Sequence, residues 1–311
     1  FLNYENNGSF KTNAKFLFFD FNGEYAGKNA IVQNKKVYNL STRTKKDILP
    51  LNNDDLLNHD LLCIFANASE KTQRPFIKRC IRLAKNINFD IEKFKNFLRK
   101  KILQILCMSD KLKADLLLDY IEQILPQKMD INEQIESLRI DFSFHDTNKY
   151  FYTGDKTTAH QNNIRENNSL VQNIAIYKQV DEFEFSGNFI KDFIRIMYVQ
   201  LIYDVLGSRA INEHIAPAIN KLKSIESDID KLFDFSGKNE SFWKNDNIVV
   251  VNLCDVNLES RKMIPMLLAH KLYKEHKAKK EEELSYLNII VDEAHNILSY
   301  QSNRESETWK D

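Results

Sequence analysis

The stretch Tyr286-Leu-Asn-Ile-Ile-Val-Asp-Glu-Ala-His-Asn-Ile-Leu298 contains an apolar run, residues 289–291, that leads directly into Asp292 and Glu293. An uninterrupted apolar run is typical of a strand that is buried on both faces of a parallel sheet. Open α/β sheets bind their ligands beyond the carboxyl ends of such strands. In nucleotide hydrolases the first acid of such a pair holds Mg²⁺, usually through water, and the second orients the attacking water. The stretch therefore predicts an ATPase-type site, and a polar surface loop after a strand is the alternative interpretation.

Two other apolar runs have the same character. Residues 15–20 end in Asp20 and are followed by a turn at Gly23 and by Glu24. Residues 247–254 are rich in β-branched side chains, and a helix predicted over 263–273 separates them from the strand at 289–291. Strand, helix and strand in this order form a βαβ unit, which is expected to cross over right-handed. For Glu24, spacing alone favours a solvated loop carboxylate over a site residue.

The residues between these strands are mostly helical in pattern. Apolar spacing predicts helices over 69–83, 91–108, 112–125, 189–205 and 211–233, the last with a break before Pro217. Residues 36–40 are expected to form a minor strand, and polar residues 142–168 a flexible excursion with an edge hairpin near 149–154. The predicted organisation is an α/β domain in two parts, residues 1–60 and 241–311, which a mostly helical insertion over 61–240 separates.

Composition excludes several classes of protein. The 311 residues are 43% hydrophobic, enough for a substantial core, and the formal net charge of +0 gives no general attraction to nucleic acid. Four scattered cysteines without a Cys-x-x-Cys pair argue against a zinc site or a disulfide framework and favour a reducing cytoplasm. No apolar run has the length of a membrane span, and no signal peptide is visible. Because the sequence begins with Phe1 and ends in a charged segment, we expect a fragment of a longer polypeptide.

A phosphate-binding loop of the form Gly-x-x-x-x-Gly-Lys-Ser/Thr does not occur in the sequence. Gly27-Lys28 and Gly237-Lys238 are each followed by asparagine, and neither has a glycine five positions earlier. Backbone amides and a lysine for the nucleotide phosphates therefore have no candidate here. Either this loop lies before Phe1 or the chain does not hydrolyse nucleotide.

Several stretches, taken in order, resemble one protein family. They are Phe18-Phe-Asp-Phe-Asn-Gly-Glu-Tyr25, Ser69-Glu-Lys-Thr-Gln-Arg-Pro-Phe76, Glu213-His-Ile-Ala-Pro217 with Leu222, residues 248–268, and residues 289–296. Together they are similar to the HerA-like branch of the HerA/FtsK superfamily, whose members are hexameric DNA-translocating ATPases. The likeness covers nearly the whole chain in the order of the family's elements.

This resemblance implies a RecA-like core, ATP and Mg²⁺ as cofactors, and a homohexameric ring around double-stranded DNA. It makes Asp292 the metal-side acid and Glu293 the catalytic base, with Asp20 and Glu24 as further active-site acids. His295 becomes a candidate for coupling the nucleotide state to neighbouring subunits, with a packing or helix-start histidine as the alternative. The family's phosphate loop would precede Phe1, and its sensor strand and intersubunit arginine would follow Asp311. Arg304 is a poor substitute for that arginine because it lies in a polar loop.

The resemblance also implies a partner protein, a nuclease or a sirtuin-like effector, in DNA processing or anti-phage defence. Two alternative functions remain. The protein can form a ring that scaffolds an effector, with nucleotide structural or absent, as the missing phosphate loop suggests. The residues Asp292-Glu-Ala-His295 can also be read as a helicase box, but that family has two RecA-like domains in tandem and no long helical insertion before this strand.

Overall fold

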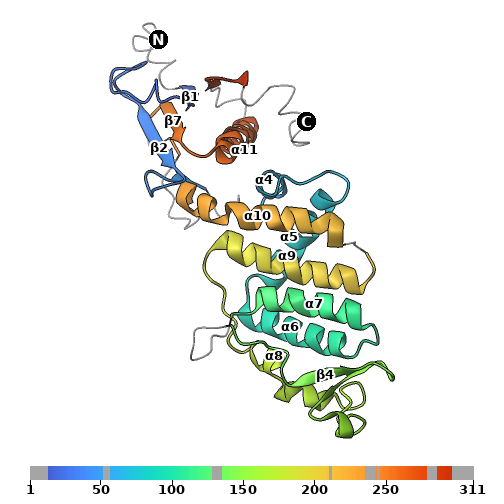
Figure 1. Cartoon of the computed structure of the whole chain (residues 1–311). Coiled ribbons are helices and arrows are strands. Elements are labelled where there is room, and N and C mark those ends of the chain that lie inside the picture. Colours follow the sequence, from blue (N-terminus) through green and yellow to red (C-terminus); the bar gives the residue numbers. More distant parts are fainter. Residues whose placement is uncertain are drawn as a thin grey trace. The chain divides into compact units, whose positions relative to one another are not determined.

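The computed structural model describes residues 13–51, 57–127, 135–209, 212–234, 242–243, 246–278 and 286–295. The chain forms two compact units, residues 1–75 with 220–311 and residues 76–219, and the backbone passes between them within α5 (Gln73–Ile87) and α10 (Asn212–Leu232) (Figure 1). The sequence placed the insertion over 61–240. The second compact unit, residues 76–219, begins later and ends earlier than that predicted insertion. The reason is that α4 (His59–Phe65) and the second half of α10 belong to the first unit.

The first unit contains a four-stranded sheet in the order β2-β7-β1-β8, and every neighbouring pair is parallel. The fold is therefore mixed α/β with a parallel central sheet, as the sequence predicted. The two inner strands carry the core, since Leu17, Val249 and Val251 are fully buried. The strands are β1 (Ala14–Asp20), β2 (Lys36–Ser41), β7 (Ile248–Asp255) and β8 (Tyr286–Val291), and a separate two-stranded parallel pair consists of β3 (Leu49–Pro50) and β6 (Phe233–Asp234).

The strand β8 lies at an edge of the described sheet, which corrects one expectation. It pairs with β1 alone among the described strands, from Ala14 opposite Tyr286 to Phe19 opposite Val291. Its residues 287–291 are half-buried, and Tyr286 is exposed. The prediction that residues 289–291 are buried on both faces was therefore wrong for the described structure. An apolar run indicates a strand, but the number of neighbouring strands depends on contacts that are distant in sequence.

The connection from β7 to β8 passes through α11 (Leu258–Lys277), so the predicted strand–helix–strand order is confirmed. The helix begins after Asn257, whose side chain accepts a hydrogen bond from the backbone N–H of Ser260. The two strands of this strand–helix–strand unit are not neighbours in the sheet, because β1, from the beginning of the chain, lies between β7 and β8. The helix contacts both β8 and α4.

One face of the sheet is covered by the chain that follows β1. Phe18 and Val250 are buried there, together with Ala14 and Ile248, and the half-buried residues packed against them include Tyr25, Ile31 and Val32. These three residues belong to the segment between β1 and β2. The segment that carries Glu24 is thus fixed to the sheet by apolar packing as well as by hydrogen bonds.

The second unit is mostly helical. Helices α6, α7 and α9 lie side by side (Figure 1), and the helices predicted near 69–83, 91–108, 112–125 and 189–205 are confirmed. An antiparallel hairpin is present near 149–154, as predicted. The elements are the later part of α5, α6 (Ile91–Leu106), α7 (Lys111–Ile124), β4 (Phe142–His145), β5 (Tyr150–Thr153), 3-10 turns at Lys156–Thr158 and Asn168–Asn173, α8 (Ala175–Lys178), α9 (Phe189–Leu206) and the start of α10. No helix in the described ranges is long and apolar enough to cross a membrane.

The break predicted before Pro217 does not occur, because α10 continues through this residue. Pro217 lies in the second turn of the helix, where its missing N–H removes a single hydrogen bond to the carbonyl four residues earlier. Burial of Ile215, Ile219 and Leu222 on the same helix favours continuation. Apolar packing along the helix therefore outweighs the local preference of proline.

Candidate functional site

The carboxyl ends of the strands bring polar side chains to one edge of the sheet. Asp20 ends β1 and pairs with Asn252 of β7 on one side. On the other side Phe19 pairs with Val291, and the N–H of Asp292 donates to the carbonyl of Phe19 at 3.0 Å. Asp20 and Asp292 therefore occupy neighbouring positions at the edge where open parallel sheets bind ligands.

Asp20 is fully buried and organises the turn that follows it. Its Oδ1 accepts hydrogen bonds from the N–H groups of Gly23 (2.7 Å) and Glu24 (3.0 Å), and its Oδ2 from those of Tyr25 (2.9 Å) and Ala26 (3.1 Å). A carboxylate has about four lone-pair positions, and four charge-assisted bonds occupy them. Asp20 thus supports the loop that carries Glu24 and has no acceptor position left for a metal ligand.

The turn lies over the end of β7. Gly23 has a φ of +83°, a conformation that glycine adopts without strain. A Cβ atom at this position would lie 3.8 Å from Asn252 Oδ1 and from Cys254 Sγ. Glu24, the next residue, is exposed. The geometry of the turn therefore holds the Glu24 backbone in place while its side chain remains in solvent.

Asp292 differs from Asp20 because one carboxylate oxygen of Asp292 accepts no hydrogen bond from the described residues. Its Oδ2 is buried and has no hydrogen-bond partner among the described residues. The negative charge of Asp292, followed by burial and by the charges of Glu24 and Asp20, raises the pKa of the nearby Tyr25 hydroxyl. These carboxylates therefore produce a negative potential around the Tyr25 side chain. The sequence did not predict Tyr25 as a neighbour of Asp292.

A magnesium ion fits this arrangement only if waters and substrate phosphates supply most of its ligands. The described residues contain no cluster of three His, Cys, Asp or Glu side chains that could hold a metal by themselves. Mg²⁺ commonly keeps several waters and binds through one or two carboxylates together with substrate phosphates. The partnerless oxygen of Asp292 fits such a role, whereas a site made entirely from protein ligands is not supported.

Glu293 and His295 form a pair in the turn after β8. Glu293 Oε2 lies 3.0 Å from His295 Nδ1, and the side chains are 37% and 71% exposed. Glu293 has a φ of +50°, which costs a non-glycine residue about 1–2 kcal/mol. Strained backbone of this kind is found disproportionately at functional sites. The structure thus brings together Asp292, Glu293 and His295 at the edge, whereas the Glu24 side chain is exposed in the loop after β1 and forms no hydrogen bond or ion pair with these described residues.

Two asparagines complete the edge, and sequence reasoning did not identify them. Asn252 Nδ2 donates to Asn39 Oδ1 at 3.0 Å, and Asn252 Oδ1 accepts from the N–H of Cys254 at 3.1 Å. Asn39 pairs with Asn252 in the register of β2 and β7. A polar residue inside a β-branched run was the available signal for Asn252, but only the register places it next to Asp20.

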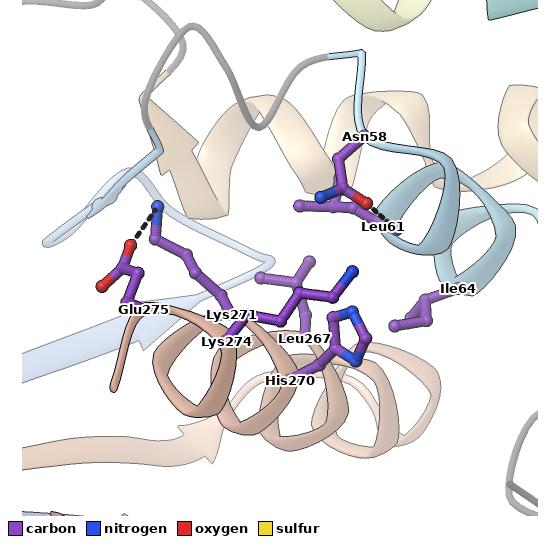
Figure 2. Close-up of a pocket in the computed structure, with 8 residues that line it drawn as sticks. All are labelled: Asn58, Leu61, Ile64, Leu267, His270, Lys271, Lys274 and Glu275. Atoms are coloured by element: carbon purple, nitrogen blue, oxygen red, sulfur yellow. Dashed lines mark hydrogen bonds and ion pairs between the residues drawn. The ribbon is translucent and has the colours of Figure 1, made fainter. Parts of the chain in front are cut away.

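A second polar cluster lies in the same unit, between α4 and α11. A cavity of about 70 Å³ lies there. Figure 2 shows side chains that line it, among them Lys271, which forms an ion pair of 3.2 Å with Glu275. Beside it, Asp60 of α4 pairs with Lys274 of α11 and lies 3.3 Å from His270 Nε2. These contacts attach α4 to the helix that leads into β8.

The Asp60 contacts predict a pH-dependent contribution to stability. Burial raises the pKa of Asp60, but the hydrogen bond and charge of Lys274, together with the hydrogen bond of His59 and the charge of His270, outweigh burial, so the pKa is lowered. A lowered pKa means that the contribution is present above the unfolded-state pKa of about 3.9 and is lost as the pH falls through the folded-state value. Because Asp60 is 43% exposed, we expect Asp60→Asn to cost only about 0.5 kcal/mol at pH 7.

This prediction can be checked by urea unfolding of the wild type and of Asp60→Asn at pH 7 and at pH 3. The difference in unfolding free energy should shrink at pH 3. Lys274→Gln is the matched control, because it removes the same ion pair from the other side. A difference that grows toward pH 3 would contradict the direction of the pKa shift.

Comparisons with protein-family models and with curated proteins find no match to this chain. The functional argument therefore rests on the geometry at the carboxyl edge of the sheet and on the residues that form it.

Proposed function

We propose that the chain belongs to an ATP-driven DNA translocase of the HerA type, with a RecA-like core and with ATP and Mg²⁺ as cofactors. The observation that carries this proposal is the position of Asp292. It follows a strand of a parallel sheet, lies beside Asp20, and has a buried oxygen without a hydrogen-bond partner among the described residues. Glu293 comes next, at a strained turn beside His295.

The proposed roles follow from these positions. Asp292 would hold a hydrated metal ion through water, and Glu293 would accept a proton from the water that attacks the γ-phosphate. His295 positions the Glu293 carboxylate through the contact at 3.0 Å. Mg²⁺, when bound, supplies positive charge to the nucleotide phosphates. Asp20 acts through the loop that it holds, and Glu24 is carried by that loop with its side chain exposed.

The assembly in this proposal is a homohexamer around double-stranded DNA in the cytoplasm, working with a nuclease or a sirtuin-like effector in DNA processing or anti-phage defence. The support is the resemblance of the sequence stretches, together with four free cysteines, which suit a reducing compartment. The neutral net charge means that DNA contact depends on a local basic surface of the assembled ring.

The test is ATP hydrolysis by the full-length protein with and without duplex DNA. The 311 residues hold no phosphate-binding loop, so the measurement requires a protein that includes one. Turnover that duplex DNA stimulates is the expected result. If neither the protein alone nor the protein with its effector partner turned over ATP, the proposed motor function would be overturned.

A ring-forming scaffold is the second candidate, and one observation favours it. The sequence has no phosphate loop. In this case assembly with the effector, measured by analytical ultracentrifugation, does not depend on hydrolysis. Loss of the complex in Glu293→Gln would argue against the scaffold.

A further inference from the structure

Helices α5 and α6 carry a strong excess of positive charge. Residues 73–106, which contain both helices, hold ten lysines and arginines and two acids, although the whole chain has a formal net charge of +0. Helix α5 alone contains five of these cations and no acidic residue. A neutral chain whose charge is separated in this way has a local basic region that its net charge conceals.

Part of this positive charge is neutralised within the second unit. Arg79 of α5 forms an ion pair of 2.9 Å with Asp204 of α9, whose side chain is fully buried. Arg99 of α6 pairs with Asp181. Removal of a cation from a buried carboxylate leaves an uncompensated charge, which is strongly destabilising. Arg79 is therefore needed for the fold and is not available to a partner.

Three other cations of α5 lie together on its outer face. Lys78, Arg82 and Lys85 are exposed, and none of their side chains has an ion pair or a hydrogen bond in the part of the chain that the structure describes. At about 100° of rotation per residue, the three fall within an arc of about 60°. We call them the α5 stripe. The opposite face of the helix is buried and consists of Phe76, Ile77, Cys80, Ile81, Ala84 and Ile87.

The surroundings of the α5 stripe favour a nucleic acid over an acidic protein as its partner. No large apolar side chain of α5 is exposed. Protein-binding surfaces have a more apolar core, from which lysine is depleted. Phosphate groups of nucleic acids, in contrast, are bound by lysine and arginine side chains through charge and hydrogen bonds, without apolar contact.

We propose that the α5 stripe binds the phosphate backbone of duplex DNA without reading its sequence. Lys78 and Lys85 are seven residues apart, which separates them by about 10 Å along the helix axis. Successive phosphates of one DNA strand are about 3.4 Å apart along the duplex axis, so three cations match about three phosphates. The choice of duplex DNA rests on the proposed function, whereas binding at the stripe requires neither nucleotide nor the acids at the carboxyl edge of the sheet.

The test is binding of a short fluorescent DNA duplex to the 311-residue chain, measured by anisotropy without nucleotide over a series of salt concentrations. The triple variant Lys78→Gln, Arg82→Gln, Lys85→Gln is expected to bind at least about tenfold more weakly. The slope of log K against log salt should fall in magnitude by about 3, since each phosphate contact contributes about 0.9. Glutamine is a good helix former, so the thermal midpoint should not change at these exposed positions.

The matched control is the triple variant Lys113→Gln, Lys156→Gln, Lys178→Gln. It removes the same charge from three different elements of the second unit, α7, the first 3-10 turn and α8. Its affinity for the duplex should fall by less than about threefold, because dispersed charges act only through a screened potential. Equal losses in the two triple variants would show that total charge, and not the α5 stripe, attracts DNA, and would overturn the proposal.

Three further outcomes decide the assignment. No binding of DNA by the wild type, or unchanged affinity in the stripe variant, would overturn it and leave α5 with a solvated outer face. Competition by poly-glutamate as strong as that by DNA of equal charge would also overturn it and assign the stripe to an acidic protein. Stripe-dependent DNA binding by a protein that does not hydrolyse ATP would support the stripe and count against the motor alone.

Discussion

Asp20→Asn is expected to destabilise the first unit by about 3 kcal/mol, since removal of one partner from a buried charged hydrogen-bond network leaves several groups unsatisfied. Asparagine has the same size as aspartate, so the change tests hydrogen bonding rather than packing. Its amide oxygen can still accept from Gly23 and Glu24. Its NH₂ group then faces the N–H groups of Tyr25 and Ala26, and donors oppose donors in a fully buried position.

This loss can be measured as a lower midpoint in urea unfolding followed by circular dichroism. The matched control is Asp47→Asn, because Asp47 accepts one hydrogen bond, from the N–H of Asn39 at 2.8 Å, and is exposed. The control is expected to cost less than about 1 kcal/mol. Similar midpoints for the two variants would show that the turn after β1 does not depend on the four bonds to Asp20.

Glu293→Gln is expected to reduce ATP turnover by at least about 100-fold, the lower range for loss of a general base, while nucleotide affinity stays unchanged. Glutamine keeps the shape of the side chain but cannot accept the proton of the attacking water. Since Glu293 is 37% exposed, the fold should tolerate the change. The measurement is kcat for ATP hydrolysis with duplex DNA, beside the nucleotide dissociation constant, in the full-length protein.

His295→Ala is the control that separates orientation of the Glu293 carboxylate from the proton transfer itself. His295 is 71% exposed and contacts Glu293 through one ring nitrogen, so its loss should reduce kcat by less than about tenfold if it only orients the carboxylate. Both variants should keep the thermal midpoint of the wild type. Turnover that survives in Glu293→Gln would refute the assignment of the base, and a larger defect in His295→Ala would transfer the main catalytic role to the histidine.

Helices and inner strands could be predicted from the sequence because their signals are local. In α9, apolar side chains recur through Phe189–Leu206, and Gly207 follows directly after the last turn. In β7 the β-branched run over Ile248–Asp255 is buried at most positions. Where a distant contact decided the outcome, local patterns were insufficient: Pro217 lies within a continuous helix because packing supports it.

The sequence by itself determined the α/β class, the order of strand, helix and strand, and the acids that follow two of the strands, since each depends on residues close together in the chain. Only the tertiary structure decided what those acids do. Parallel pairing brings Asp292 beside Asp20, and the turn after β1 directs four N–H groups to Asp20 and none to Asp292. Two acids with the same sequence signal therefore differ, because hydrogen-bond donors reach both oxygens of Asp20, whereas one oxygen of Asp292 has no partner in the part of the chain that the structure describes.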